Sequence, residues 1–361
     1  MAGEDLSSSE LAEPPLPPLT REGFADVQHG LEDAVREATR RQGISRWFWG
    51  EGVCLLALVR LSRARGEQDP AEVAAFMDSF RAAPPVLEHV NNLAPGAALA
   101  ELHRRDPRPE YRSLLDACLA WYETAPEATR DAGGALEHWP GGVWADTVYM
   151  AGQFLLRAGT ALERQDLVSE AERQWIAHAE LLQDEATGLL AHGTHQGVRI
   201  PCHWGRANAW FALSGADILA VTGSPEVRQR LTLLLESAAR RQPEHGVWDV
   251  LLDDAAETRG ILETSAAAGL GAALLRTAAL SEDEAVRGRL AAAGERAVLG
   301  SLSYVRDGLL TRVSAGTILQ LIPFGYSVIR DDRPQPWGQG LTMEALAAWR
   351  ETAHLRKEIP A

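Results

Sequence analysis

Cysteine, basic charge and long apolar runs are all scarce in this chain of 361 residues. Its three cysteines, Cys54, Cys118 and Cys202, are far apart and form no CxxC pair, which indicates neither a disulfide framework nor a metal site. We expect three reduced thiols in a cytoplasmic protein, with Cys54 and Cys118 in the core. No stretch approaches the roughly 20 apolar residues that a membrane span needs.

Charge excludes further classes of partner. Lysine and arginine total 35 against 50 aspartates and glutamates, a formal charge of −15. Nucleic acids and anionic membrane surfaces both favour a basic protein face, so neither is an expected partner. A small anionic substrate remains compatible, because one local arginine can outweigh a diffuse negative field.

The first residues differ in composition from the rest. Residues 1–18 are acidic and proline-rich and lack a signal-peptide pattern, which predicts a disordered tail. The remaining residues, 19–361, show no linker. With 46% hydrophobic residues in the chain, they are sufficient for one large domain.

Apolar residues recur at helical spacing, and strand alternation persists nowhere. The pattern predicts twelve helices separated by short Gly, Pro or Asp punctuation, near residues 21–41, 48–66, 70–82, 92–105, 109–124, 144–162, 166–183, 204–222, 225–241, 260–279, 283–300 and 338–353. Longer loops recur between them. Twelve helices with this loop pattern favour six helical hairpins closed into an (α/α)6 barrel. An α-solenoid is disfavoured, because no 34- or 40-residue consensus repeats.

Eleven tryptophans is a high count for this length, and several lie in loops or at helix starts: Trp139, Trp144, Trp204, Trp248 and Trp337. An indole at a helix start is often only a packing residue. Collected at one end of a barrel, several would form a platform that stacks on a sugar ring. Spacing alone leaves both interpretations open.

Five phrases in fixed order resemble those of the unsaturated uronyl hydrolases, glycoside hydrolase families 105 and 88. They are "VNNLAPG" from 90, "VWADTVYM" from 143, "HWGRANAW" from 203, "GVWDVLLDDAAETRGILETSAAA" from 246 and "PWGQG" from 336. Together they span most of the chain after the tail, and family 105 is the closer resemblance. The resemblance implies an (α/α)6 barrel, in agreement with the helix count. It also implies an oligosaccharide substrate whose terminal uronic acid carries a C4=C5 double bond.

That bond is an enol ether, which sets the chemistry that the resemblance implies. Protonation of C4 generates an oxocarbenium-like centre at C5, water attacks it, and the resulting hemiketal opens to release the rest of the sugar chain. One carboxyl group can donate the first proton and accept one from water, so no cofactor or metal is expected. A proton donor near neutrality needs a raised pKa, which burial beside apolar walls supplies.

Asp146 stands where a loop meets an apolar helix. An Asp there commonly caps the helix by accepting from free amides. The resemblance instead identifies Asp146 as the catalytic acid, with Trp144 and Met150 as apolar surroundings. Some relatives carry an assisting Asp at the position of Asn91. An Asn can orient water but cannot share a proton, and Asn91 or Asn92 could equally cap the following helix.

The remaining candidate residues would bind the sugar. Arg206 shares a helix face with Trp210 and could clamp a uronate carboxylate through two nitrogens, or could be an ordinary surface arginine. Trp210 could instead be core. Asn208 either binds hydroxyls or braces a loop. In "HGTHQG", His192 fits the family pattern as a residue that orients sugar or water.

Thr194 and His195 depart from that pattern, so we expect an altered subsite there. Trp144, Trp204 and Trp337 are candidates for the stacking platform. Glu263 and Thr264 are expected to stabilise a helix start.

Three functions remain open. The first is hydration of an unsaturated uronyl end, such as unsaturated galacturonyl-rhamnose, by a monomeric enzyme. The second is a barrel recruited to protonate or hydrate another unsaturated ring in a biosynthetic pathway, which the changes at Asn91 and at 192–197 keep open. The third is a non-catalytic sugar-binding barrel.

Overall fold

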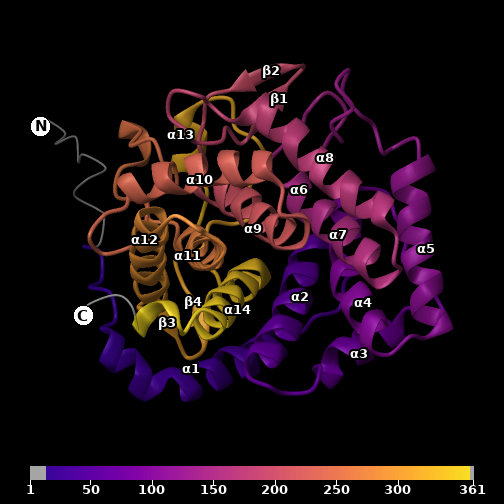
Figure 1. Ribbon diagram of the computed structural model, residues 1–361, viewed down its shortest axis with the longest axis horizontal. Helices are drawn as coiled ribbons and strands as arrows, with labels where there is room; N and C mark the ends of the chain where they lie inside the picture. The colour runs from indigo at the N-terminus through magenta and orange to yellow at the C-terminus, as the bar shows by residue number, and fades with distance from the viewer. Residues whose placement is uncertain (1–13, 358–361) are drawn as a thin grey trace, which may run out of the picture.

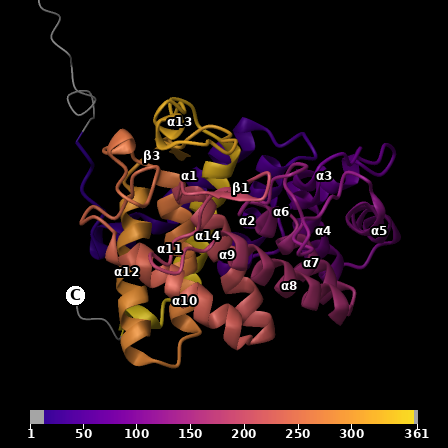
Figure 2. The same cartoon turned by 90° about the horizontal axis from the view of Figure 1, so that it is seen from above.

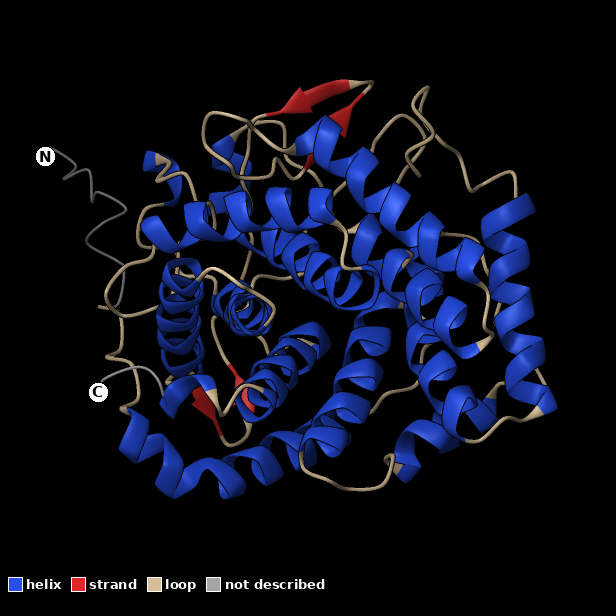
Figure 3. Ribbon diagram, viewed as in Figure 1, coloured by secondary structure: helices blue, strands red, loops and turns tan. Residues whose placement is uncertain are grey.

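The computed structural model describes residues 14–357. Its α-helices are α1 (Arg21–Gln42), α2 (Trp49–Ala64), α3 (Ala71–Ser79), α4 (Ala94–Arg105), α5 (Pro109–Thr124), α6 (Thr147–Met150), α7 (Gly152–Ala161), α8 (Gln165–Leu182), α9 (Gly205–Thr222), α10 (Pro225–Arg240), α11 (Thr264–Ala279), α12 (Glu284–Leu302), α13 (Pro323–Ser327) and α14 (Pro336–Glu351). Figure 3 shows how fully helices dominate the chain. Among the described residues, no helix is both long and apolar enough to cross a membrane.

The inner helices form a closed ring. Each contacts the next in the order α2, α4, α7, α9, α11 and α14, and α14 returns to α2; the short α6 joins α7 in contacting α9. Around them, α1 packs against α14 and α5 against α4, while α8, α10 and α12 each contact two neighbouring inner helices, and α3 lies beside α2 and α4 (Figure 1). The chain therefore alternates between an outer and an inner layer, and the predicted (α/α)6 barrel is confirmed.

Local sequence explains where helices begin and how closely they pack. Thr20, Ser224 and Asp283 each accept a backbone N–H at the start of the helix that follows, as N-cap residues do. Gly269 of α11 lies against two inner neighbours, where an added Cβ would stand 2.9 Å from the Cβ of Ala209 and 3.0 Å from Leu341. Small residues thus allow the inner helices to approach one another.

The helix predicted over 144–162 is interrupted. It divides at Ala151 into α6 and α7, and Ser214 Oγ of α9 donates to Val148 O at this point. That carbonyl would otherwise accept from Gly152 in a continuous helix. The short helix α13 and two small hairpins were not predicted. They are β1 (Gly193–His195) with β2 (Val198–Ile200), and β3 (Val305–Arg306) with β4 (Leu309–Leu310).

One apolar core fills the barrel, running from Phe24 to Leu355. Cys54 and Cys118 lie in it as free, fully buried thiols, as predicted. Residues 1–13 of the predicted tail lie outside the described residues. Leu16 and Pro17 were also assigned to that tail, yet Leu16 N donates to Tyr304 Oη and Pro17 O accepts from Ser303 Oγ. These two residues pack on the folded chain.

Candidate active site

A cavity of 240 Å³ lies at the N-terminal ends of the inner helices. Its lining includes Asn91, His138, Trp144, Asp146, Trp204 and Arg206, together with Trp49 and the loop residues 316–318. We call this the inner cavity. A larger hollow of 740 Å³ lies over the outer helices α8 and α10, but polar side chains such as Glu180, Glu226 and Gln229 dominate its lining and it holds no aromatic platform.

Asp146 immediately precedes α6, yet its side chain makes no capping hydrogen bond. The backbone holds it in place: Ala145 N donates to His192 O on one side, and Asp146 O accepts from Met150 N on the other. The residue is 8% exposed and lines the inner cavity. Of the two roles that the sequence left open for Asp146, capping is therefore excluded.

The partner of Asp146 is His192. Oδ2 of Asp146 and Nε2 of His192 lie 3.3 Å apart, and neither of these buried atoms makes a hydrogen bond with a described residue. Burial raises the pKa of Asp146, but His192, His138 and Arg206 together outweigh it and hold the pKa below its ordinary value. We expected a raised pKa for the catalytic acid. In the free protein that expectation is wrong, because the interactions with these three neighbours outweigh the effect of burial.

His138 is a buried residue that the sequence analysis did not single out. Its ring stacks on Trp144 at 4.6 Å, and its Nδ1 is 3.0 Å from Thr147 Oγ1. Burial lowers the pKa of His138 to about 3, so this histidine is neutral near neutral pH. The only sequence signal was a histidine eight residues before Asp146, in a loop that gives no reason to expect burial.

Asn91 and Asn92 divide the roles that the sequence could not assign. Asn92 is structural, because its side chain accepts from Glu88 N and His89 N and donates to Trp47 O. The Asn91 side chain lines the inner cavity, and among the described residues it has no hydrogen-bond partner. Asn91 is therefore free to bind a ligand or water.

Arg206 is fully buried rather than on the surface. Its Nη1 lies 3.3 Å from Glu263 Oε2 and donates to Ser314 O and Oγ, while its Nη2 donates to Ala315 O. Both terminal nitrogens thus hold the loop that covers the inner cavity. A two-nitrogen clamp on a substrate carboxylate is not formed here, since Arg206 is already paired with Glu263.

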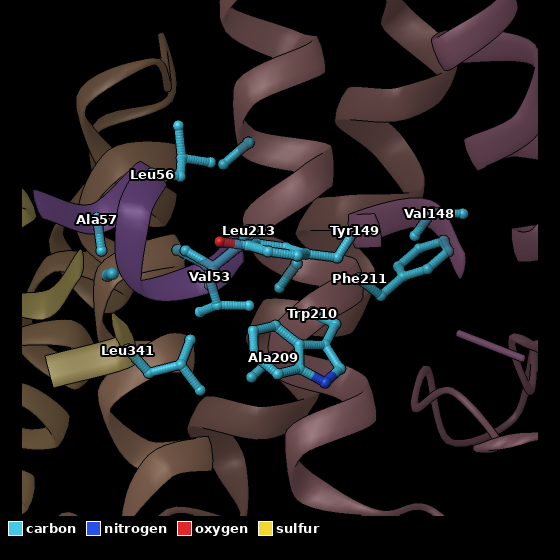
Figure 4. Packing of buried hydrophobic residues seen from close by; sticks show 14 of the residues in the cluster. Val53, Leu56, Ala57, Val148, Tyr149, Ala209, Trp210, Phe211, Leu213 and Leu341 are labelled. Atoms are coloured by element: carbon cyan, nitrogen blue, oxygen red, sulfur yellow. The ribbon is translucent and has the colours of Figure 1, made fainter. Parts of the chain in front are cut away.

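Two residues proposed to bind sugar are structural instead. Asn208 is buried and braces a loop: it accepts from Leu190 N and donates to Leu190 O and Trp204 O. Trp210 lies in the core, where Figure 4 shows it beside Tyr149. The centroids of the two rings are 4.7 Å apart. Helical spacing puts Trp210 and Arg206 near one face, but Arg206 stacks on Trp204 instead, 4.3 Å from its ring.

The tryptophans divide between the cavity and the core. Trp144 and Trp204 line the inner cavity, while Trp337 stands behind Trp49 at 4.3 Å and supports it from outside the lining. Trp248 donates to Ala238 O and belongs to the core. Trp49 itself was missed, because a tryptophan in an apolar helix start carries no distinguishing signal.

A second space adjoins the first and shares Trp139, Trp144 and Ile318 with it. This outer cavity measures 490 Å³ and is also lined by Thr194, His195, Leu319 and Leu321. No Asp, Glu, Lys or Arg lines it. The hairpin β1–β2 forms one wall: Thr194 pairs with Arg199, and the turn uses Gln196 and Gly197 at φ of 49° and 77°.

Metal ligands do not converge in this site. Among residues 14–357, no three His, Cys, Asp or Glu side chains lie as a metal ion would need. Of the neighbours Cys202 and His203, the histidine Nδ1 is 2.8 Å from Asp253 Oδ2 and the thiol is buried.

Known proteins resemble this chain both in sequence and in fold. The family described as Glycosyl Hydrolase Family 88 matches residues 27–352. The unsaturated rhamnogalacturonyl hydrolase YesR of Bacillus subtilis is 34% identical over 280 residues, which cover 72% of this chain and 76% of YesR. A 24.9 kDa protein in the picA locus of Rhizobium radiobacter is 30% identical over 167 residues, covering 42% of this chain and 71% of that protein.

Solved structures share the fold. A possible member of glycoside hydrolase family 105 from Salmonella enterica superposes with a TM-score of 0.79 at 24% identity, covering 96% of this chain and 97% of that one. The unsaturated glucuronyl hydrolase of Bacillus sp. GL1 gives a TM-score of 0.71 at 18% identity, covering 89% and 95%. At these identities the likeness concerns the barrel alone.

Proposed function

The chain belongs to glycosyl hydrolase family 88 and is a glycosidase of the unsaturated uronyl hydrolase type; within that class, we propose that it hydrates the C4=C5 bond of an unsaturated galacturonyl residue attached to a neutral sugar such as rhamnose. One observation carries the proposal. A buried carboxyl group, Asp146, stands at the wall of a cavity with His192 as its close partner.

Asp146 is the proposed acid and base. Its Oδ2 is buried against His192, so Oδ1 is the oxygen with access to the cavity. A proton on Oδ1 passes to C4 of the substrate, and the C4=C5 electron pair forms the new C–H bond and leaves C5 electron-poor. Water then adds to C5 and returns a proton to Asp146. The product hemiketal opens, and the leaving sugar departs with its glycosidic oxygen.

A carboxyl group with a lowered pKa is a poor proton donor near neutral pH, so substrate binding has to raise the pKa of Asp146. The substrate brings its own carboxylate into the inner cavity, and a like charge nearby raises the pKa of a buried carboxyl group. Arg206 does not cancel this effect in full, because its charge is already balanced by Glu263. Substrate binding therefore favours the protonated form of Asp146 that the reaction consumes.

The N-terminal ends of the inner helices favour an anionic ligand. The residues at or just before α2, α4, α6 and α9 line the inner cavity, and helix N-termini carry partial positive charge. Asn91 offers an amide in the same space, suited to orienting the attacking water. It cannot supply a second proton, so Asp146 performs both transfers.

The outer cavity supports a neutral leaving sugar. Ile318, Leu319, Leu321 and Trp139 present apolar surface there, and no Asp, Glu, Lys or Arg side chain lines it. A sulfated or carboxylated sugar would lose water without gaining an ionic partner. A deoxy sugar such as rhamnose has a methyl group that can lie on such a surface.

The experiment is a comparison of two substrates. The purified protein is incubated with unsaturated galacturonyl-rhamnose and with a sulfated unsaturated glucuronyl disaccharide, and the far-ultraviolet absorbance of the C=C–COO⁻ group is followed. We expect the band to decay for the first substrate and to decay at least about tenfold more slowly for the second, a difference of about 1.4 kcal/mol.

Two controls make the result specific. In D₂O the product should carry one deuteron at C4, and Asp146→Asn should abolish the decay while the protein still binds the disaccharide. Faster turnover of the sulfated substrate would overturn the neutral leaving sugar. Absence of decay with both substrates in the wild-type protein would overturn the proposed function.

A further inference from the structure

Tyr326 lies on α13, is fully buried and belongs to the same apolar core as the barrel helices. Its hydroxyl oxygen lies 2.7 Å from His192 Nδ1. Gln320 N donates to the same oxygen at 3.3 Å. The loop that closes the inner cavity thus carries a phenol aimed at the partner of Asp146. Figure 2 shows α13 and β1, which follows His192, at the same face of the barrel.

The donors and acceptors around the Tyr326 hydroxyl group determine which atom donates the proton in this contact. A phenol has one proton to donate, and here its oxygen already accepts from Gln320. Among the described residues, His192 Nδ1 is the only acceptor within reach of that proton. If Nδ1 carried its own hydrogen, the buried phenol would lose its acceptor, which is unfavourable. Nδ1 therefore accepts from Tyr326, and a neutral His192 carries its proton on Nε2.

We propose that Tyr326 is a positioning residue that fixes the Nε2–H tautomer of His192, so that His192 holds Oδ2 of Asp146 and leaves Oδ1 for proton transfer. The inference rests on the proposed function. The other tautomer would point the Nε2 lone pair at the carboxylate oxygen 3.3 Å away. Asp146 would then be free to rotate away from the reacting carbon.

The surroundings keep this arrangement fixed. The ring of His192 lies 4.6 Å from the ring of Trp204, and its backbone N donates to Cys202 O. Burial raises the pKa of Tyr326, so the phenol keeps the proton that it donates. The other titratable or charged groups that act on this trio are His138, Arg206 and Cys202.

The first test observes the tautomer directly and needs no turnover. Imidazole ¹⁵N chemical shifts of His192 are measured in the wild-type protein and in Tyr326→Phe, with His192→Gln used to assign the signals. We expect a protonated Nε2 and an unprotonated Nδ1 in the wild type, and a mixture of tautomers in Tyr326→Phe. A protonated Nδ1 in the neutral wild-type histidine would overturn the proposal.

The second test uses kinetics on unsaturated galacturonyl-rhamnose. Tyr326→Phe should lower kcat at least tenfold with KM changed less than threefold, and should displace the pH profile of kcat. Tyr304→Phe is the matched control, because that buried tyrosine also accepts a backbone N–H, from Leu16, but lies outside both cavities. Its kcat and pH profile should equal those of the wild type.

A double variant separates positioning from general support of the fold. If Tyr326 acts through His192, Tyr326→Phe should cost less than threefold further in the His192→Gln background. Losses that multiply in the double variant would overturn the proposal. A wild-type protein without turnover would refute the proposed function, while the ¹⁵N result would still decide the tautomer.

Discussion

The two ends of the barrel bury carboxylates in opposite ways. In its second half, each inner helix contributes at least one charged side chain to a single network, whose central members are Arg60, Glu101, Arg157, Asp217, Arg276 and Glu344. Three arginines thus meet three acids. At the N-terminal ends of the same helices, Asp146 has one partner, His192, at 3.3 Å.

The difference separates a charge that stabilises from a charge that reacts. Asp217 accepts from Arg60, Arg157 and Gln153, and these arginines hold its pKa far below the ordinary value despite burial. All three bonds reach its Oδ2, which leaves that oxygen no capacity for a ligand. Asp146 has one cavity-facing oxygen that accepts no hydrogen bond from the described residues, which leaves it able to exchange a proton with a ligand.

The largest expected effect concerns activity at the N-terminal ends of the inner helices, where Asp146 lines the inner cavity. We call this the open end of the barrel. Asp146→Asn should reduce kcat by about 10³-fold, because general acid–base catalysis contributes that order of magnitude. Its free energy of unfolding should change by about 1 kcal/mol or less, since the substitution alters the 3.3 Å contact with His192 but removes no hydrogen bond of the Asp146 side chain. Turnover and urea unfolding are measured on the same preparation. Unfolding before any activity can be assayed would contradict the comparison.

At the opposite end of the barrel, which holds the network of charged side chains and which we call the closed end, a substitution should lower stability and leave activity nearly unchanged. Asp217→Asn leaves Arg60 and Arg157 facing each other without their shared carboxylate, and breaking a buried ion pair costs about 3–5 kcal/mol. Urea unfolding should show that loss, while kcat per folded molecule stays within about twofold, because the network lies outside the inner cavity. A variant as stable as the wild type would show that the ring of charges does not stabilise the barrel.

A smaller effect is expected from the neutral histidine at the open end. His138 has a pKa of about 3 in the folded protein and about 6.5 when unfolded, so between these values the unfolded state binds a proton that the folded state does not. The free energy of unfolding has its full value above pH 6.5 and decreases as the pH is lowered, by up to about 1.4 kcal/mol per pH unit. In His138→Asn the free energy of unfolding should therefore depend less on pH between 6.5 and 4, by the contribution of one histidine, as urea unfolding can measure. An unchanged slope would contradict the burial of a neutral ring.

The pH dependence of catalysis tests the claim that substrate alters Asp146. The kcat/KM profile reports the free enzyme, in which His192, His138 and Arg206 lower the pKa of Asp146 against the effect of burial. The kcat profile reports the complex, in which the substrate carboxylate raises it. Both rates fall as pH rises through the pKa of the acid, so the basic limb of kcat should lie at higher pH. Coincident limbs would contradict the proposed like-charge effect.

Sequence alone predicted the barrel well, because helical periodicity is a local signal and the family phrases follow one another in order along the chain. Position 146 was also accessible through its motif. The role of Arg206 was not, since the pattern W-x-R-x-N-x-W says nothing of Glu263 and Ser314, which reach it from 57 and 108 residues away. Tyr326 was missed for the same reason: it meets His192 across 134 residues. Pairings that the tertiary fold creates leave no mark in spacing.

The smallest effect is expected in the outer cavity, which belongs to the open end but touches no charge. Ile318 is 64% exposed and lines both cavities, so Ile318→Ser should raise KM for unsaturated galacturonyl-rhamnose about two- to fivefold, the range for losing part of one apolar contact. The kcat value should hold, because Asp146 and His192 are untouched. Leu233→Ser, on outer helix α10, is the control and should leave both constants unchanged. A fall in kcat with constant KM would mean that Ile318 acts on the reacting carbon rather than on the leaving sugar.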